Sequence, residues 1–178
     1  EAGYENVYNV EPSKDAVSNR PPHLSDAMIC DILRPGMFPS ESVDVICFFQ
    51  VFDHLPDPRG ILEICYDMLK PGGMILFVHH DVEAWSARLL GEKSPIIDIE
   101  HLYLYSRETM RRILELENFE VTETGSVWNT YSLSYLVRYL PLPKQLKEKV
   151  LGLTEKSSLA RNIILRVPLG NLYAIARK

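Results

Sequence analysis

Short apolar runs alternate with helix-like patterns along most of the chain, as in βα units that build a largely parallel sheet. The apolar runs predict strands over residues 7–10, 28–32, 43–49, 74–80, 119–124, 162–167 and 172–176. The other pattern predicts helices over residues 13–19, 57–70, 82–90 and 106–118. We therefore expect an α/β fold with a single hydrophobic core.

The segment VDVICFF at residues 43–49 is nearly all apolar, which predicts a central strand covered on both faces by helices. The helix that follows starts at Asp57, a capping residue, with Pro58 at its first position, where the missing N–H does no harm. Its predicted buried side chains recur at i, i+3, i+4 and i+7: Ile61, Ile64, Cys65 and Met68. Pro71-Gly72-Gly73 is expected to end it.

The pattern changes after residue 125. Residues 126–153 look helical but are broken by Pro141 and Pro143, and they carry an aromatic stretch that includes Trp128, Tyr131, Tyr135 and Tyr139. Aromatic faces pack well on sugars and lipids, so this segment could form a lid over an acceptor, or cover the sheet edge as ordinary core. We expect a single domain over 1–178, with 1–125 as its main part, 126–161 as a helical insertion or lid, and 162–178 as the region of the last strand.

Composition narrows the class of protein further. The 178 residues are 46% hydrophobic and 24% charged, as in a globular domain. The net charge of −5 argues against a general nucleic-acid binder. Residues 1–137 carry a net charge of −12 and residues 138–178 a net charge of +7. The basic end could contact an anionic surface or simply be a solvated face.

The three cysteines, Cys30, Cys47 and Cys65, form no CxxC pair and have no histidine partners at zinc spacing. They are interpreted as reduced core thiols of a cytoplasmic protein. No apolar stretch approaches the length of a membrane span, and the first residues lack a signal pattern. No metal site is predicted.

Ligands of open α/β sheets lie beyond the carboxyl ends of the strands. The residues at or just after the carboxyl ends of the predicted strands are Glu11, Asp31, Phe49 with Gln50, and the run His79-His80-Asp81. A carboxylate at such a position can accept two hydrogen bonds from a ribose diol, and Glu11 fits this role. A strand-ending glutamate that merely faces solvent is the alternative.

Four segments resemble the class I S-adenosylmethionine-dependent methyltransferases: VYNVEPS, VDVICFFQVFDHLPDP, ILEICYDMLKPGGMILFV and the ending PLGNLYAIARK. The segment EHLYLYSRETMRRILELENFEV is similar to the subgroup associated with sugar and polysaccharide biosynthesis. The resemblance implies a Rossmann-like sheet with helices on both faces and an antiparallel last strand.

The same resemblance implies S-adenosylmethionine as cofactor and a small-molecule or sugar-like methyl acceptor. It implies cofactor contacts from Glu11, with Pro12 beside it, at the ribose hydroxyls, from Asp31 and Ile32 at the adenine, and from Phe49 and Gln50 at the methionine portion. The cofactor's methyl group is already electrophilic, so the protein mainly has to bind, align and exclude water.

An acceptor hydroxyl could require a base, and histidine titrates near neutral pH. The candidates are His54, one helical turn after Gln50, His80 at a strand end, and His101 in the segment EHLYLYS. Each could instead be a capping or packing residue. Tyr103 and Tyr105 are expected pocket walls.

The family places a GxGxG-like loop after its first strand, and this sequence contains no GxG. We expect the first strand and its glycine loop to be absent from this chain, which would leave two apolar sheet edges exposed. An upstream segment, a second copy of the chain, or a partner protein could fill the gap.

Two other functions remain open. A non-catalytic binding or scaffold module would keep the sheet without the cofactor loop. A nicotinamide-dependent dehydrogenase would share the strand-end acid, but it requires a glycine fingerprint that the segments LKPGG and FDHLPDP fit poorly.

Overall fold

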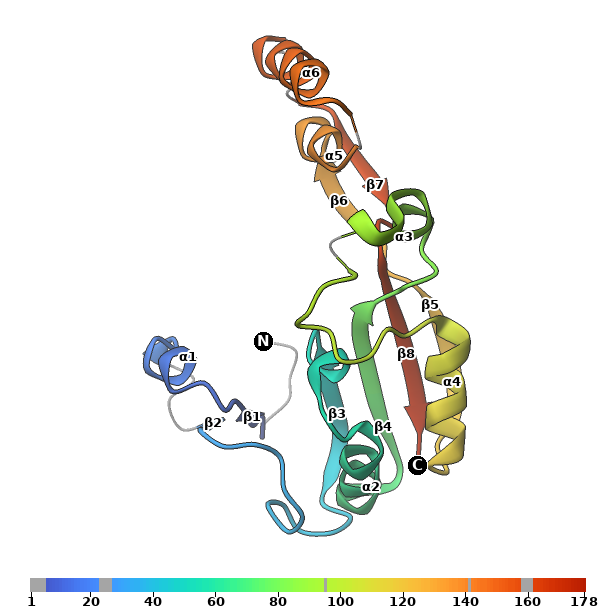
Figure 1. Cartoon of the computed structure of the whole chain (residues 1–178). Coiled ribbons are helices and arrows are strands. Elements are labelled where there is room, and N and C mark those ends of the chain that lie inside the picture. The colour runs from blue at the N-terminus through green and yellow to red at the C-terminus, as the bar shows by residue number, and fades with distance from the viewer. Residues whose placement is uncertain (1–5, 23–26, 95, 141, 158–161) are drawn as a thin grey trace.

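The computed structural model describes residues 6–22, 27–94, 96–140, 142–157 and 162–178 (Figure 1). The strands are β1 (Asn9–Val10), β2 (Met28–Ile29), β3 (Val43–Phe49), β4 (Leu69–His80), β5 (Glu120–Ser126), β6 (Asn129–Ser132), β7 (Ile164–Val167) and β8 (Asn171–Arg177). The helices are α1 (Lys14–Ser18), α2 (Pro58–Met68), α3 (Trp85–Leu90), α4 (Arg107–Leu116), α5 (Leu133–Tyr139) and α6 (Lys144–Lys156), with 3₁₀ turns η2 (Phe52–His54) and η3 (Gly91–Lys93).

A four-stranded sheet in the order β3-β4-β8-β5 forms the centre of the molecule. Strands β3 and β4 are parallel, with Ile46 opposite Ile75. Strand β8 runs antiparallel to both of its neighbours, β4 and β5. The α/β class and the antiparallel last strand are therefore confirmed.

Strands β1 and β2 form a separate parallel pair, which stands apart from the four-stranded sheet in Figure 1. Among the described residues, β3 hydrogen-bonds to β4 alone. Its outer face exposes Val45, and Phe49 is 59% exposed. The prediction that residues 43–49 form a central strand covered on both faces is wrong, because β3 is an edge strand in the part of the sheet that the structure describes.

The core lies on the face of the sheet that carries Ile75 and Phe77, where helices α2 and α4 pack. The cap predicted at Asp57 is present, and α4 also begins at a capping residue. The Asp57 carboxylate accepts a hydrogen bond from the Gly60 N–H at 3.0 Å, and Ser106 forms a reciprocal capping box with Thr109. Local capping chemistry thus fixes where both core helices begin.

A small two-stranded sheet lies at the amino-terminal end of β8, where β6 and β7 pair antiparallel (Figure 1). Helices α5 and α6 extend beyond this pair. The expectation of a purely helical segment after residue 125 is wrong at residues 129–132, because these residues pair with β7. Of the helices in the described ranges, none combines the length and the apolar character needed to cross a membrane.

The cysteines occupy different environments. Cys65 on α2 is fully buried, whereas Cys30 and Cys47 are exposed. The interpretation of all three as core thiols is therefore wrong for Cys30 and Cys47. Cys47 is exposed because it lies on the open outer face of β3. Burial raises the pKa of the Cys65 thiol to about 12.

Candidate functional site

The chain turns sharply after β3 and places a short 3₁₀ turn at the carboxyl end of the sheet. Gln50 takes a left-handed backbone conformation with φ 54°, and its N–H donates to the Val78 carbonyl at 2.7 Å. The fully buried Phe52 then anchors the turn against Phe77, with ring centroids 4.8 Å apart. This packing fixes the positions of Asp53 and His54, the next two residues.

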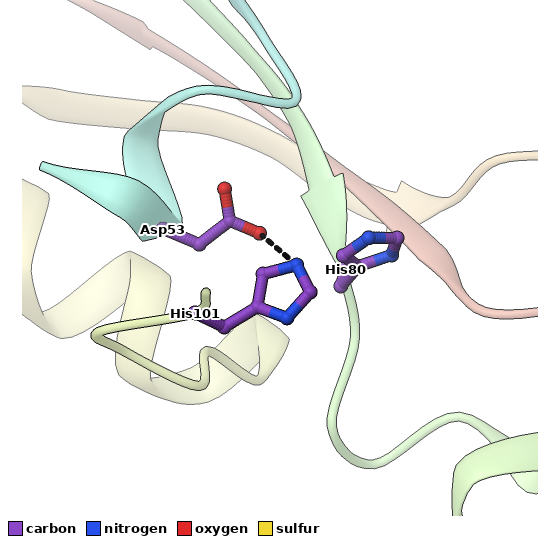
Figure 2. A group of neighbouring side chains, drawn as sticks. All are labelled: Asp53, His80 and His101. Carbon is purple, nitrogen blue, oxygen red and sulfur yellow. Dashed lines mark ion pairs between the residues drawn. The ribbon is translucent and has the colours of Figure 1, made fainter. Parts of the chain in front are cut away.

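All three histidines predicted from the sequence meet at this place. His54 comes from η2, His80 from the end of β4, and His101 from the loop before α4. The rings of His54 and His101 lie 4.8 Å apart, and those of His80 and His101 also lie 4.8 Å apart, edge to face. Segments distant in sequence thus form one cluster, part of which Figure 2 shows.

Asp53 lies at the centre of this cluster, and the sequence analysis did not single it out. Its side chain is 2% exposed, and neither carboxylate oxygen has a hydrogen-bond partner among the described residues. The nearest ring nitrogens are Nε2 of His54 at 3.8 Å and Nε2 of His101 at 3.9 Å (Figure 2 shows the latter contact). The signal that could have found Asp53 is an acidic residue placed between a strand end and a candidate histidine.

Hydrogen bonds determine which ring nitrogen of two of these histidines carries the proton. Nδ1 of His54 lies 2.8 Å from the Glu100 carbonyl, and Nδ1 of His80 lies 3.0 Å from Oδ1 of Asn171. Both partners accept hydrogen bonds, so each Nδ1 must donate. In the neutral rings, Nε2 of His54 and of His80 therefore keeps a free lone pair. Burial lowers the pKa of His80, which favours its neutral form.

Behind the cluster lie groups that belong to the core. His79 is fully buried, and its Nδ1 lies 3.0 Å from the His80 carbonyl while Nε2 lies 3.4 Å from the Met110 sulfur. Burial lowers the pKa of His79 and raises the pKa of Tyr105. Tyr103, by contrast, is 40% exposed, and its hydroxyl donates to the Pro56 carbonyl at 3.2 Å.

The six residues expected to bind a cofactor fall into two groups on different sheets. Glu11, Pro12, Asp31 and Ile32 follow β1 and β2, whereas Phe49 ends β3 and Gln50 follows it. The first group is held together because the Glu11 N–H donates to the Ile29 carbonyl at 3.0 Å. Within the described ranges, no ladder hydrogen bond joins the β1–β2 pair to β3.

The side chains of these residues have the chemical character that binding of S-adenosylmethionine requires. Two carboxylates, those of Glu11 and Asp31, lie at neighbouring strand ends and could accept hydrogen bonds from ribose hydroxyls and an adenine amine. The Glu11 carboxylate also accepts the Ser13 N–H at 2.8 Å, and Asp31 pairs with Arg34 at 2.6 Å. The exposed Phe49 ring offers an apolar contact beside Gln50.

A cavity of about 380 Å³ lies next to the histidine cluster. His80 lines one part of it, and most other lining residues are apolar or aromatic. The lining includes Trp85 and Leu89 of α3, and Tyr131 and Tyr135 from the insertion, whose ring centroids stack 4.9 Å apart. The segment predicted as an insertion or lid thus contributes to the cavity wall.

Comparison with solved structures shows which proteins share this fold. A protein of Bacillus halodurans C-125, crystallised as a candidate methyltransferase, matches with a TM-score of 0.60 and 16% identity over 95% of this chain and 81% of its own. A SAM-dependent methyltransferase from Aquifex aeolicus matches with a TM-score of 0.55 and 14% identity over 97% and 68%. The [4+2]-cyclase SpnF has a TM-score of 0.59 and 15% identity over 95% and 65%. The chain therefore has the α/β Rossmann-like fold of class I methyltransferases.

Sequence comparison defines the family. Ubiquinone biosynthesis O-methyltransferases of Shewanella sp. (strain ANA-3) and Pasteurella multocida (strain Pm70) are 30% and 36% identical over 53 residues, which is 29% of this chain. The match spans only 22% of the length of each of these relatives. The family model described as Methyltransferase domain matches residues 1–124. The chain belongs to this methyltransferase domain family.

Proposed function

We propose that the chain is the larger C-terminal part of a cytoplasmic enzyme that transfers a methyl group from S-adenosylmethionine to a hydroxyl oxygen of a small-molecule or sugar-like acceptor. One observation carries this proposal: histidines with a free Nε2 lone pair gather beside an apolar cavity at the carboxyl end of the sheet. The O-methyltransferase names of the matched relatives support an oxygen acceptor. The three free cysteines support a reducing compartment.

The cavity would hold the acceptor. Its lining is mainly apolar with one imidazole at the edge, which is typical of sites that bind the body of a ligand by burial and orient it by a few polar groups. Trp85 and Tyr135 supply aromatic surface for a ring-shaped acceptor. This lining favours an acceptor with an aromatic or lipid-like part over a bare polar sugar.

His54 would act as the base. Its Nδ1 donates to the Glu100 carbonyl, so the ring is oriented and its Nε2 can accept a proton from the acceptor hydroxyl. Asp53, 3.8 Å from this Nε2, would stabilise the imidazolium that forms. S-adenosylmethionine, when bound, supplies an electrophilic methyl group that needs no further activation. The remaining work of the protein is alignment and the exclusion of water.

Completion of the cofactor site would require a strand between β1 and β3. Support comes from the unpaired edge of β3, its exposed Val45 and Phe49, and the separation of the β1–β2 pair from the main sheet. A strand inserted there would hydrogen-bond to the open edge of β3 and bring Glu11 and Gln50 to the same sheet. A helix that follows this strand would pack on the open face and cover the apolar side chains. We propose that an upstream segment of the natural protein fills this position.

Transfer of a tritiated methyl group from S-adenosylmethionine to a panel of phenols and phenyl glycosides, catalysed by the chain extended upstream by about one βα unit, tests the function. His54→Gln should lower kcat by about 10²–10⁴-fold while leaving the affinity for S-adenosylhomocysteine unchanged. The loss should shrink as the pH rises, because solvent increasingly removes the hydroxyl proton. A variant that keeps full kcat at neutral pH would refute the role of His54.

The separation of β1–β2 from β3 also favours a second candidate, a binding or scaffold module without catalysis. Such a module would bind neither S-adenosylmethionine nor its demethylated product, whatever the length of the chain. Calorimetric titration of both compounds therefore separates the two functions.

A further inference from the structure

The buried carboxylate of Asp53 has no hydrogen-bond partner among the described residues, and this state is costly. A buried charged group without a partner typically destabilises a fold unless a counter-charge or a metal ion satisfies it. Two ring nitrogens face Asp53 at 3.8 and 3.9 Å, beyond hydrogen-bond distance. Both oxygens of Asp53 therefore keep lone pairs that a bound cation could use.

Three side chains of two types that suit a transition metal, one carboxylate and two imidazoles, converge on this point. One oxygen of Asp53 and one ring nitrogen each of His80 and His101 all lie within 4.8 Å of one another, and Figure 2 shows the three side chains together. Two ligand atoms that each lie about 2.1 Å from one ion are about 3.4 Å apart in tetrahedral geometry. Small side-chain rotations would therefore close the three groups around an ion.

The surroundings of the two histidines favour the same conclusion. Nδ1 of His101 lies 3.0 Å from the Asp98 carboxylate but makes no hydrogen bond in the geometry described, whereas His80 donates its Nδ1–H to Asn171. Histidines that bind a metal through one nitrogen are typically oriented in this way, by an oxygen acceptor on the other nitrogen. In His80 this arrangement leaves Nε2 as the unprotonated atom.

We propose that Asp53, His80 and His101 form a binding site for one divalent transition-metal ion. Two imidazoles and one carboxylate on one side of an ion leave further coordination positions open. Nitrogen ligands favour ions such as Zn²⁺, Co²⁺ or Fe²⁺ over Mg²⁺ and Ca²⁺, which prefer oxygen. The sequence could not reveal this site, because its three ligands come from three separate segments.

The open positions give the site a role that rests on the proposed function. An acceptor oxygen bound to the ion would lose its proton more readily, since a bound cation stabilises the oxyanion. That proton would go to Nε2 of His54, which lies 3.8 Å from Oδ1 of Asp53. The metal site would thus select acceptors that present a hydroxyl group at the edge of the cavity.

Binding of Co²⁺ tests the site without any assay of methyl transfer. Cys30 and Cys47 are first alkylated, because exposed thiolates bind the same ions. The 178-residue chain is then titrated with Co²⁺ and followed by visible absorption and calorimetry. We expect one ion per chain, d–d bands typical of nitrogen and oxygen ligands, and displacement by Zn²⁺ but not by Mg²⁺.

Variants assign the ligands. Asp53→Asn and His101→Gln should each lower the Co²⁺ affinity by at least about tenfold, and Asn171→Ala should lower it by about 10–100-fold through the orientation of His80. Asp81→Asn is the matched control, since Asp81 is equally buried but its carboxylate already accepts the Glu83 N–H at 3.0 Å. Circular dichroism verifies that each variant is folded.

Two results would overturn the proposal: a wild-type chain that binds no Co²⁺, or an affinity that Asp53→Asn and His101→Gln leave unchanged. Both results concern metal binding alone. If Co²⁺ binds as described while S-adenosylmethionine and S-adenosylhomocysteine bind neither to this chain nor to a chain extended upstream by about one βα unit, the metal site stands and the proposed methyl transfer fails.

Discussion

Phe52 should be among the side chains on which stability depends most, because it is fully buried and packs where the sheet meets the candidate site. Its ring lies 4.8 Å from that of Phe77 and 5.4 Å from that of Tyr105. Phe52→Ala removes these contacts and leaves a cavity that rigid neighbours cannot fill. We expect a loss of about 3–5 kcal/mol in the free energy of unfolding.

Phe49 provides the matched control, since it is the same residue type three positions earlier. Its side chain is 59% exposed, compared with 0% for Phe52. Full burial of a phenylalanine is worth about 1.5–3 kcal/mol, so Phe49→Ala should cost about 1 kcal/mol or less. The contrast between the two variants isolates burial from residue type.

Urea unfolding of the 178-residue chain, followed by circular dichroism, measures both variants. With an m value of about 2 kcal/mol per molar, Phe52→Ala should lower the midpoint by about 2 M and Phe49→Ala by about 0.5 M or less. Phe52→Leu serves as a milder variant if Phe52→Ala does not fold. Equal losses for Phe52→Ala and Phe49→Ala would refute the assignment of Phe52 to the core and of Phe49 to an open face.

Three further predictions follow from glycine, histidine and cysteine positions. Gly152→Ala should stabilise α6 by up to about 1 kcal/mol, because nothing lies within 4 Å of the added Cβ. Gly125→Ala should destabilise the fold, because its Cβ would lie 2.7 Å from the ring of Tyr173. Thermal melts of the two variants test both predictions. Because burial lowers the pKa of His79 in the folded chain, the unfolded chain takes up a proton first as the pH falls. The free energy of unfolding should therefore decrease between about pH 7 and pH 5, and this decrease should be smaller in the His79→Gln variant. Iodoacetamide at pH 8 should alkylate Cys47 in the folded chain but reach Cys65 only after unfolding, and mass spectrometry would contradict this if both react together.

Much of the fold could be predicted from the sequence, because its signals are local. The cap at Asp57, the capping box at Ser106 and the apolar run of β3 each depend on a few neighbouring residues. Strand β6 could not be predicted, because its polar sequence NTYS becomes a strand only through pairing with β7. The edge position of β3 also depends on which strands pair, and its apolar sequence does not contain that information.

The candidate site was predicted in part. The sequence predicts His54 one helical turn after Gln50, His80 at a strand end and His101 in the segment EHLYLYS, and the structure brings the three together. Asp53 was missed, because an acidic side chain in a turn normally faces solvent and only tertiary packing buries it. The separation of Glu11 from Gln50 likewise depends on sheet pairing rather than on local sequence.

Cofactor binding tests the central claim most directly. S-adenosylmethionine and S-adenosylhomocysteine would be titrated calorimetrically into the 178-residue chain and into a chain extended upstream by about 40 residues, about one βα unit. The account predicts one site in the extended chain, weakened by Glu11→Ala, and weak or no binding to the shorter chain. Binding of neither compound to either chain would contradict the proposed methyl transfer.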